Sequence, residues 1–312
     1  MPSISLVMPL FNKEQYAERA IRSVLAQTVA DFELIVVNDG STDNGPNRVR
    51  AVNDKRIRVI DQPNTGVSAA RNRGIEAARA DLIAFLDADD EWASDFLATI
   101  LRLRERFSSC DVYATNYSFC GRHYRRRAVI RGLPDDFKEG ILPDYFAVAA
   151  HSDPPLWTCA VAVTKRAITS VNGFPVGITA GEDLLTWARL AARYDIAYSS
   201  EVKAYFRAPG AIADRPGRIP QTPDIVGQEL LQIRREGNPC RIKEIEKYVA
   251  LWHRMRANIY IRLGNTAAAR RELRDAMTYA ASFKLLMLYG IALIPQKVAA
   301  KVVEKTTQVR YR

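Results

Sequence analysis

Hydrophobic residues in the first 90 positions of the chain gather in four short runs, and the stretches between them include apolar residues at helical spacing. The runs cover residues 4–11, 32–37, 57–60 and 82–86. Short apolar runs that alternate with amphipathic helices are typical of buried parallel strands joined by right-handed crossovers. The pattern therefore predicts an α/β fold in which the carboxyl ends of four strands share one edge of the sheet.

The strongest chemical signal follows the fourth run, where Asp87, Asp89 and Asp90 place three carboxylates within four positions. Turn formers with side-chain oxygens also follow the second run, at residues 38–43, and the third, at residues 64–66. Ligands bind at this edge of open α/β sheets, and clustered carboxylates suit a divalent cation bridged by phosphates. A metal-held nucleotide is one interpretation, and a solvated acidic turn that caps the next helix is the other.

The second half of the chain divides into two parts. A further apolar run covers residues 156–163, and prolines at positions 216, 220 and 223 mark a later boundary. Helical periodicity follows over residues 225–235, 242–263 and 266–280. The sequence thus predicts an α/β domain over residues 1–215 and a helical C-terminal extension with a basic tail over residues 216–312.

Charge and cysteine usage narrow the class of protein. The 45 basic and 35 acidic side chains give a net charge of +10, which permits a nucleotide, a phospholipid surface or a nucleic acid as partner. The four cysteines lack the paired spacing of a zinc site and favour a reduced cytosolic protein. Neither a signal peptide nor an apolar segment of the roughly 20 residues that span a bilayer is evident. A cytoplasmic location is expected.

The C-terminal tail combines an apolar segment with cations. Residues 283–294 are almost entirely apolar, and they are followed by Lys297, Lys301, Lys305, Arg310 and Arg312. An in-plane helix on anionic lipid explains this combination and would make the protein peripheral at the inner face of a membrane. A helix docked on the body with a basic end explains it equally well.

Five sequence blocks carry a resemblance to a known family. They are Met8-Pro9-Leu10-Phe11-Asn12, Asn38-Asp39-Gly40-Ser41-Thr42-Asp43, Asn64-Thr65-Gly66 with Arg71 to Gly74, Phe85-Leu86-Asp87-Ala88-Asp89-Asp90, and Gly181-Glu182-Asp183 ahead of an amphipathic helix. In this order and spacing they resemble glycosyltransferase family 2. The resemblance implies a GT-A fold, which is Rossmann-like with a mostly parallel sheet flanked by helices. It also implies a nucleotide-diphosphate sugar donor, a Mn²⁺ or Mg²⁺ ion and inversion at the anomeric carbon.

The resemblance assigns roles to individual residues. Asp183 would be the general base, Asp89 the metal ligand, and Glu182 and Trp187 acceptor-side residues. The donor-binding residues would be Pro9, Phe11, Glu14, Asp39, Asn64, Gly66, Arg71, Asp87 and Ala88. Structural alternatives exist for several of them, because Asp39 can fix a turn and the carboxylates of Glu14, Glu182 and Asp183 can each complement a helix N-terminus. Trp187 can equally be a core residue.

One position departs from the family pattern. Ala208 stands where many relatives have a histidine that can be a further metal ligand. The metal would then rest on Asp89, the diphosphate and water. The basic residues 124–127 are interpreted as a solvated strand edge or an acceptor-side anion contact, so no nucleic-acid partner is expected.

The predicted function is inverting, non-processive transfer of a sugar to the hydroxyl of a glycan or lipid-linked acceptor, in bacterial cell-surface polysaccharide or glycolipid assembly. Non-processive transfer is favoured because the Gln-x-x-Arg-Trp element of polymerising relatives is absent from the sequence. Two alternatives are a catalytically silent nucleotide-sugar-binding module, which the alanine at position 208 suggests, and a sugar nucleotidyltransferase. The second would need a glycine-rich basic loop after the first strand, and residues 9–14 offer none.

Overall fold

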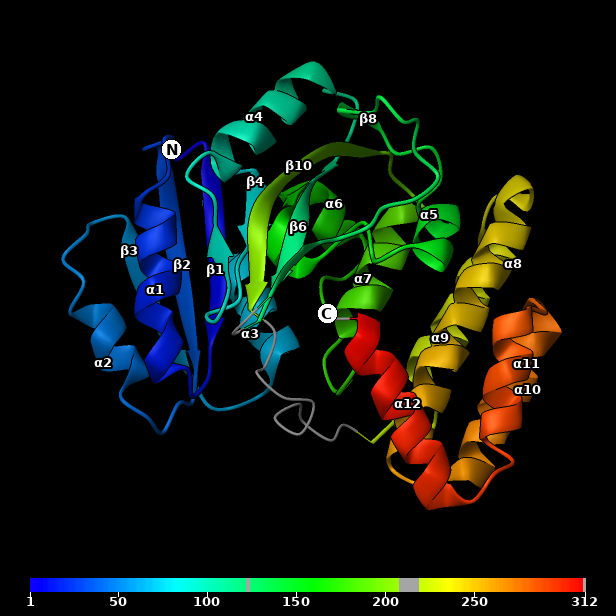
Figure 1. Cartoon of the computed structure of the whole chain (residues 1–312). Helices are drawn as coiled ribbons and strands as arrows, with labels where there is room; N and C mark the ends of the chain where they lie inside the picture. Colours follow the sequence, from blue (N-terminus) through cyan, green and yellow to red (C-terminus); the bar gives the residue numbers. More distant parts are fainter. Residues whose placement is uncertain (122–123, 208–218, 311–312) are drawn as a thin grey trace. The chain divides into compact units, whose positions relative to one another are not determined.

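The computed structural model describes residues 1–121, 124–207 and 219–310, with side chains described up to residue 303 (Figure 1). The chain forms two compact units. The first comprises Met1–Tyr145, Asp153–Gly177 and Glu182–Ala208, and the second comprises Phe146–Ser152, Ile178–Gly181 and Pro209–Arg312. The predicted boundary at residue 215 lies outside the described residues and stays a prediction.

The first unit is built on one sheet with the strand order β3-β2-β1-β4-β9-β6-β10-β5. Its N-terminal strands are β1 (Ile4–Leu10), β2 (Phe32–Asp39), β3 (Ile57–Gln62) and β4 (Leu82–Phe85). These four strands pair in parallel, as their apolar runs predict, with Pro9 opposite Val37 and Asn38 opposite Asp61. Every residue of β2 and β4 is buried, so both faces of these strands are covered. Their carboxyl ends therefore meet at one edge of the sheet.

The other half of the sheet has mixed directions. Its strands are β5 (Glu91–Trp92), β6 (Val112–Cys120), β7 (Arg125–Arg127), β8 (Glu139–Ile141), β9 (Val161–Thr164) and β10 (Ile196–Arg207). Strand β9 runs antiparallel between β4 and β6, whereas β10 runs parallel to β6. The apolar run at 156–163 is only partly a strand, because Thr158–Ala160 forms a 3₁₀ turn ahead of β9. Periodicity does not distinguish such a buried turn from a strand.

The first unit also contains the helices α1 (Glu14–Leu25), α2 (Gly45–Arg50), α3 (Val67–Ala77), α4 (Phe96–Arg106), α6 (Lys165–Ser170) and α7 (Glu182–Ala191). Helix α5 (Tyr145–His151) belongs almost entirely to the second unit. The core includes an aromatic cluster in which the Phe174 ring lies 5.2 Å from Phe85 and 5.5 Å from Trp187. Trp187 is 1% exposed, so its side chain is a core residue and has no free face to offer an acceptor.

The second unit is helical over the residues with predicted helical periodicity. Its helices are α8 (Ile225–Glu236), α9 (Ile242–Arg262), α10 (Thr266–Tyr279), α11 (Phe283–Ile291) and α12 (Gln296–Arg310). Gly264 has a φ of 77°, and Asn265 caps α10 by accepting a hydrogen bond from Ala268 N, so the chain turns between α9 and α10. Leu273 and Ala276 of α10 pack with Ile261 of α9. The predicted helical extension is confirmed.

No helix within the described part of the chain is long and apolar enough to cross a bilayer.

Gly74 of α3 allows this helix to lie directly against β1. A Cβ atom at position 74 would stand 2.3 Å from Cγ1 of Val7, which is buried in the centre of β1. We expect Gly74→Ala to destabilise the protein by about 1–3 kcal/mol, because overpacking outweighs the gain in helix propensity. Gly290→Ala in α11 is the matched control, since nothing lies within 4 Å of its added Cβ. Urea denaturation should show destabilisation only for the first variant, and equal curves would contradict the packing argument.

Candidate functional site

The carboxylates after β4 lie at the carboxyl edge of the sheet, and each has a different partner. Asp87 Oδ1 accepts a hydrogen bond from Arg71 at 2.8 Å, and Asp89 Oδ2 accepts one from Lys13 at 2.5 Å. Asp90 Oδ1 accepts a hydrogen bond from the backbone N–H of Arg207 at 2.9 Å. The three side chains therefore tie the end of β4 to α3, to the start of α1 and to the end of β10.

Asp90 has a structural position. It is 1% exposed, whereas Asp87 and Asp89 have about 30% of their side chains exposed. Burial raises the pKa of Asp90 well above the usual carboxyl value, and the neighbouring charges of Asp87 and Asp89 raise it further. A group held in this way anchors β10, and it leaves Asp87 and Asp89 as the accessible acids of the cluster.

Arg71 joins this cluster to the start of α7. Its side chain is 4% exposed, and its guanidinium lies 2.8 Å from Asp87 and 3.7 Å from Glu182. Burial by itself lowers the pKa of Arg71, but Asp87, Glu182 and Asp183 together raise it above the usual arginine value. The guanidinium also lies over the Phe174 ring, 5.0 Å from its centre. One buried cation thus brings the acids of two distant sequence blocks into a single site.

Asp39 organises the loop that precedes α3. Its Oδ1 accepts hydrogen bonds from Thr65 N and Gln62 Nε2 at 2.9 and 2.8 Å, and its Oδ2 accepts one from Gly66 N at 2.9 Å. Gly66 has a φ of 92°, a conformation that side chains with a Cβ rarely adopt. Asp39 is 3% exposed. The observed contacts of Asp39 are therefore those of a residue that fixes a turn. Asn64 and Gly66 are exposed and form the surface of the loop.

The other expected donor residues lie along the same edge. Pro9 lies near the end of β1, and Phe11 follows that strand with 44% of its surface exposed. Glu14, in the first turn of α1, accepts hydrogen bonds from the Arg48 side chain and from Asn44 N. Ala88 is 2% exposed between the two accessible acids. Their roles in donor binding stay predictions.

Lys13 is a site residue that sequence reasoning missed. It occupies the N-cap position of α1, where a cation opposes the helix dipole and a capping side chain is usual. That mismatch is the signal that could have identified it. The ion pair with Asp89 explains why a lysine occupies this position, because the two charges compensate each other at the sheet edge.

The acidic cluster fits a divalent cation held through one main protein ligand. Asp87 is engaged by Arg71 and Asp90 is buried. Lys13 pairs with Oδ2 of Asp89, so Oδ1 of Asp89 is the oxygen atom that can reach a cation. Carboxylate oxygen is the ligand type that Mg²⁺ and Mn²⁺ prefer, and these ions often take their other ligands from phosphates and water. The position of the missing histidine, Ala208, lies outside the described residues.

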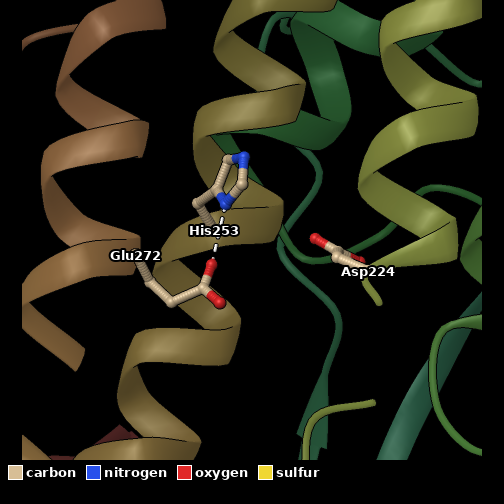
Figure 2. Close-up of side chains that lie close together, drawn as sticks. All are labelled: Asp224, His253 and Glu272. Carbon is tan, nitrogen blue, oxygen red and sulfur yellow. Dashed lines mark hydrogen bonds and ion pairs between the residues drawn. The ribbon is translucent and has the colours of Figure 1, made fainter. Parts of the chain in front are cut away.

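A second acidic group lies in the second unit and has a different character. Figure 2 shows His253 pointing toward Glu272, 2.8 Å away, with Asp224 on the other side. The three side chains offer ligand atoms within 4.8 Å of one another. The Arg256 guanidinium, however, lies 2.8 Å from Glu272 and 3.4 Å from Asp224, and Trp252 donates to both oxygens of Asp224. These carboxylates are already neutralised, so the group is a structural network linking α8, α9 and α10.

The strand order and the flanking helices match the GT-A fold. The chain is similar to S. aureus TarS in complex with UDP, with a TM-score of 0.67 at 18% identity, covering 100% of this chain and 93% of that one. It is also similar to the mannosyltransferase PcManGT of Pyrobaculum calidifontis in complex with GDP-Man and Mn²⁺, with a TM-score of 0.60 at 20% identity, covering 99% and 87%. At these identities the likeness shows the fold.

The sequence matches a family model over part of its length. Residues 5–152, just under half of the chain, match the model of glycosyl transferase family 2. An uncharacterized glycosyltransferase of Rickettsia conorii is 31% identical over 199 residues, which are 62% of this chain and 31% of the relative. The uncharacterized glycosyltransferase EpsJ of Bacillus subtilis is 47% identical over 92 residues, or 29% and 27% of the two chains. The matched residues thus span about a third of these relatives, and the resemblance in the sequence blocks is confirmed.

Proposed function

We propose that the protein is an inverting glycosyltransferase that moves a sugar from a nucleoside diphosphate to an acceptor hydroxyl. The observation that carries the proposal is the contact of buried Arg71 with both Asp87 and Glu182. It brings the acids assigned to the donor and the acid assigned to the base, Asp183, into one site. The structures of similar fold that hold UDP, UDP-GlcNAc or GDP-Man support a nucleotide-sugar donor.

The chemistry needs one protein base. Asp183 is the second residue of α7 and is partly exposed, and its Oδ1 accepts a hydrogen bond from Leu184 N at 2.7 Å, which orients the carboxylate. The carboxylate takes the proton of the acceptor hydroxyl as the oxygen attacks the anomeric carbon, and the diphosphate leaves from the opposite face of the sugar. Glu182, ion-paired with Arg71, holds the start of α7 in place. When bound, a Mn²⁺ or Mg²⁺ ion on Asp89 would neutralise charge on the leaving diphosphate.

The acceptor is proposed as a glycan or lipid-linked saccharide of the bacterial cell surface, with one sugar transferred per encounter. A chondroitin synthase of Pasteurella multocida is 35% identical over 120 residues, 12% of its own length, and supports a polysaccharide acceptor. The family model and the relatives favour a transferase over a sugar nucleotidyltransferase. A silent nucleotide-sugar-binding module is the alternative that an activity measurement must exclude.

The test is release of nucleoside diphosphate from UDP- and GDP-sugars, with and without Mn²⁺. We expect release by the wild type in Mn²⁺ and a loss of about 10²-fold or more in Asp89→Ala, because the leaving charge is no longer neutralised. Asp81→Ala is the matched control, since Asp81 is an exposed acid just before β4 that pairs with Arg104 at 2.7 Å. If wild type and Asp89→Ala release equally slowly, or neither releases product, the enzyme proposal fails and a binding module is favoured.

A peripheral position at the inner face of a membrane is also proposed. Helix α11 exposes Phe283, Leu286 and Met287 by 77%, 59% and 53%, and Leu293 and Val298 follow at 63% and 51%. The first three recur at helical spacing on one face. No acidic residue occurs between positions 276 and 303, whereas Lys297 and Lys301 are exposed. An exposed apolar face beside cations suits an anionic lipid surface. The end of the predicted basic tail lies outside the described side chains.

Vesicle flotation tests this surface. We expect the wild type to float with vesicles containing phosphatidylglycerol and to float less as salt is raised, because the cations act through screened charge. The variant Leu286→Glu/Met287→Glu should stay in the bottom fraction. Leu263→Glu on an exposed position of the same unit, 44% exposed, is the control and should float as the wild type does. Equal flotation of both variants would refute a role for α11.

A further inference from the structure

A basic hollow of about 420 Å³ lies beside the acidic edge in the first unit. It is lined by Glu91, Gly121, Tyr124, Arg125, Tyr205 and Arg207. Glu91 begins β5 two positions after Asp89, and Arg207 N donates to Asp90. The hollow therefore lies next to the acidic cluster that is proposed to hold the leaving group.

The hollow carries excess positive charge. One oxygen of Glu91 is shared by two guanidinium groups, that of Arg19 at 2.7 Å and that of Arg207 at 2.6 Å. Arg125 is exposed, and no acidic side chain of the described residues pairs with it. The lining of the hollow thus contains two arginines and one carboxylate, and that carboxylate is also paired with Arg19 from outside the lining. Burial raises the pKa of the Cys120 thiol, Arg207 and Arg125 oppose that rise, and Glu91 and Asp90 add to it, so Cys120 lies within reach of both arginines.

The side chains are arranged for a planar or tetrahedral anion. The Arg125 guanidinium lies over the Tyr205 ring, 4.3 Å from its centre, which fixes its plane and leaves its edge N–H groups free to donate. Arg207 comes from β10, and both Arg125 and Arg207 are register partners of Cys120 on β6, which lies between β7 and β10. Two guanidinium groups from different strands can share a phosphate, whose terminal oxygens accept several charge-assisted hydrogen bonds. The volume exceeds that of a phosphate alone and leaves room for the group that carries it.

Sheet order separates this hollow from the donor residues. The expected donor residues lie at the ends of β1, β2 and β4 and in α3, whereas the hollow lies at the ends of β6, β10 and β5. In the sheet, β9 stands between β4 and β6. The base and ribose of a donor on the β1 and β2 side leave the β10 side of the acidic cluster to the acceptor.

We propose that this hollow binds a phosphate group carried by the acceptor, so that the acceptor is a phosphorylated polyol or saccharide. Arg125 and Arg207 hold the phosphate by charge-assisted hydrogen bonds, and the acceptor hydroxyl extends from it toward the acidic cluster. That the phosphate belongs to an acceptor rests on the proposed transferase function. Binding of phosphate to the hollow can be measured without turnover.

The first experiment measures binding of inorganic phosphate to the full chain without metal, by ³¹P line broadening at constant ionic strength. Arg125→Gln should weaken binding about 10-fold or more, since it removes a charge-assisted interaction. Arg127→Gln is the matched control on the same strand, exposed and lining a separate cavity, and should bind as the wild type does. Saturating UDP or GDP removes any phosphate bound at the donor locus. Equal binding by wild type and Arg125→Gln under these conditions would overturn the proposal.

The second experiment compares acceptors that differ only in phosphate. Glycerol phosphate is paired with glycerol, and a lipid diphosphate-linked sugar with its unphosphorylated glycoside. We expect Arg125→Gln to lower kcat/KM about 10-fold for phosphorylated acceptors with the KM of the donor unchanged. The pair that shows this loss identifies the source of the phosphate, and an equal loss for both members of each pair overturns the proposal. Absence of wild-type turnover with intact phosphate binding would instead refute the transferase function.

Discussion

Replacing Asp183 by asparagine is expected to lower sugar transfer by about 10²–10⁴-fold while donor binding is retained. The amide keeps the size and the hydrogen bond of the carboxylate but cannot accept the acceptor's proton. Asp183 lies in the first turn of α7, close enough to Arg71 to raise the pKa of that buried guanidinium. Transfer rates and thermal protection by UDP or GDP, measured on the same preparation, separate catalysis from binding.

The competing interpretation of Asp183 is a charge that complements the N-terminus of α7. That role is worth about 0.3–1 kcal/mol of stability and has no effect on proton transfer. Glu244→Gln is the matched control, because Glu244 lies in the first turn of α9, a helix of the second unit, and pairs with Lys247. We expect both variants to lose a similar small amount of stability and only Asp183→Asn to lose activity. Unchanged transfer by Asp183→Asn would remove this residue from the role of base.

Replacing Arg71 by glutamine is expected to have the largest effect on the fold. Arg71 is almost fully buried, and its removal leaves Asp87 and Glu182 facing each other without a cation. Breaking a buried ion pair by removing one partner costs about 3–5 kcal/mol. We expect a loss of this size in urea denaturation and a drop of at least about 10²-fold in transfer, since the start of α7 no longer has a fixed position.

Arg73→Gln provides the control for Arg71. Arg73 lies on the same helix, is 56% exposed and forms a surface pair with Glu76 at 3.4 Å. Its replacement should change stability by less than about 0.5 kcal/mol. Similar effects of the two substitutions on the free energy of unfolding would show that the buried ion pairs of Arg71 do not contribute the stability predicted here.

The parallel half of the sheet could be predicted from the sequence, because a strand that is buried on both faces has a continuous run of apolar residues. Leu82–Phe85 forms such a strand with every residue buried, and its end is visible where Asp87 begins the charge cluster. The positions of Asp39 and Asp89 follow from the same pattern, whereas Asp183 was singled out by the resemblance of residues 181–183 to a family block. Their family roles came from the resemblance, and they await the measurements described above.

Contacts between residues that are distant in the sequence could not be predicted from it. The pair of Lys13 with Asp89, and the bond from Arg207 N to Asp90, depend on which strands become neighbours, and an apolar pattern does not encode that choice. Strand β9, which lies antiparallel between β4 and β6, is an example. The apolar pattern of a short buried strand does not indicate in which direction the strand runs relative to its neighbours.

The position of Arg71 also has a consequence for how the protein is made. The cation lies on α3, while its buried acidic partner Glu182 begins α7, more than 100 residues later in the chain. A nascent chain that has emerged only as far as the acidic cluster after β4 would have to bury this guanidinium against Asp87 alone, which is unfavourable. Stable closure of the site therefore waits for synthesis of α7, so that the proposed donor site is complete only when nearly all of the first unit has left the ribosome.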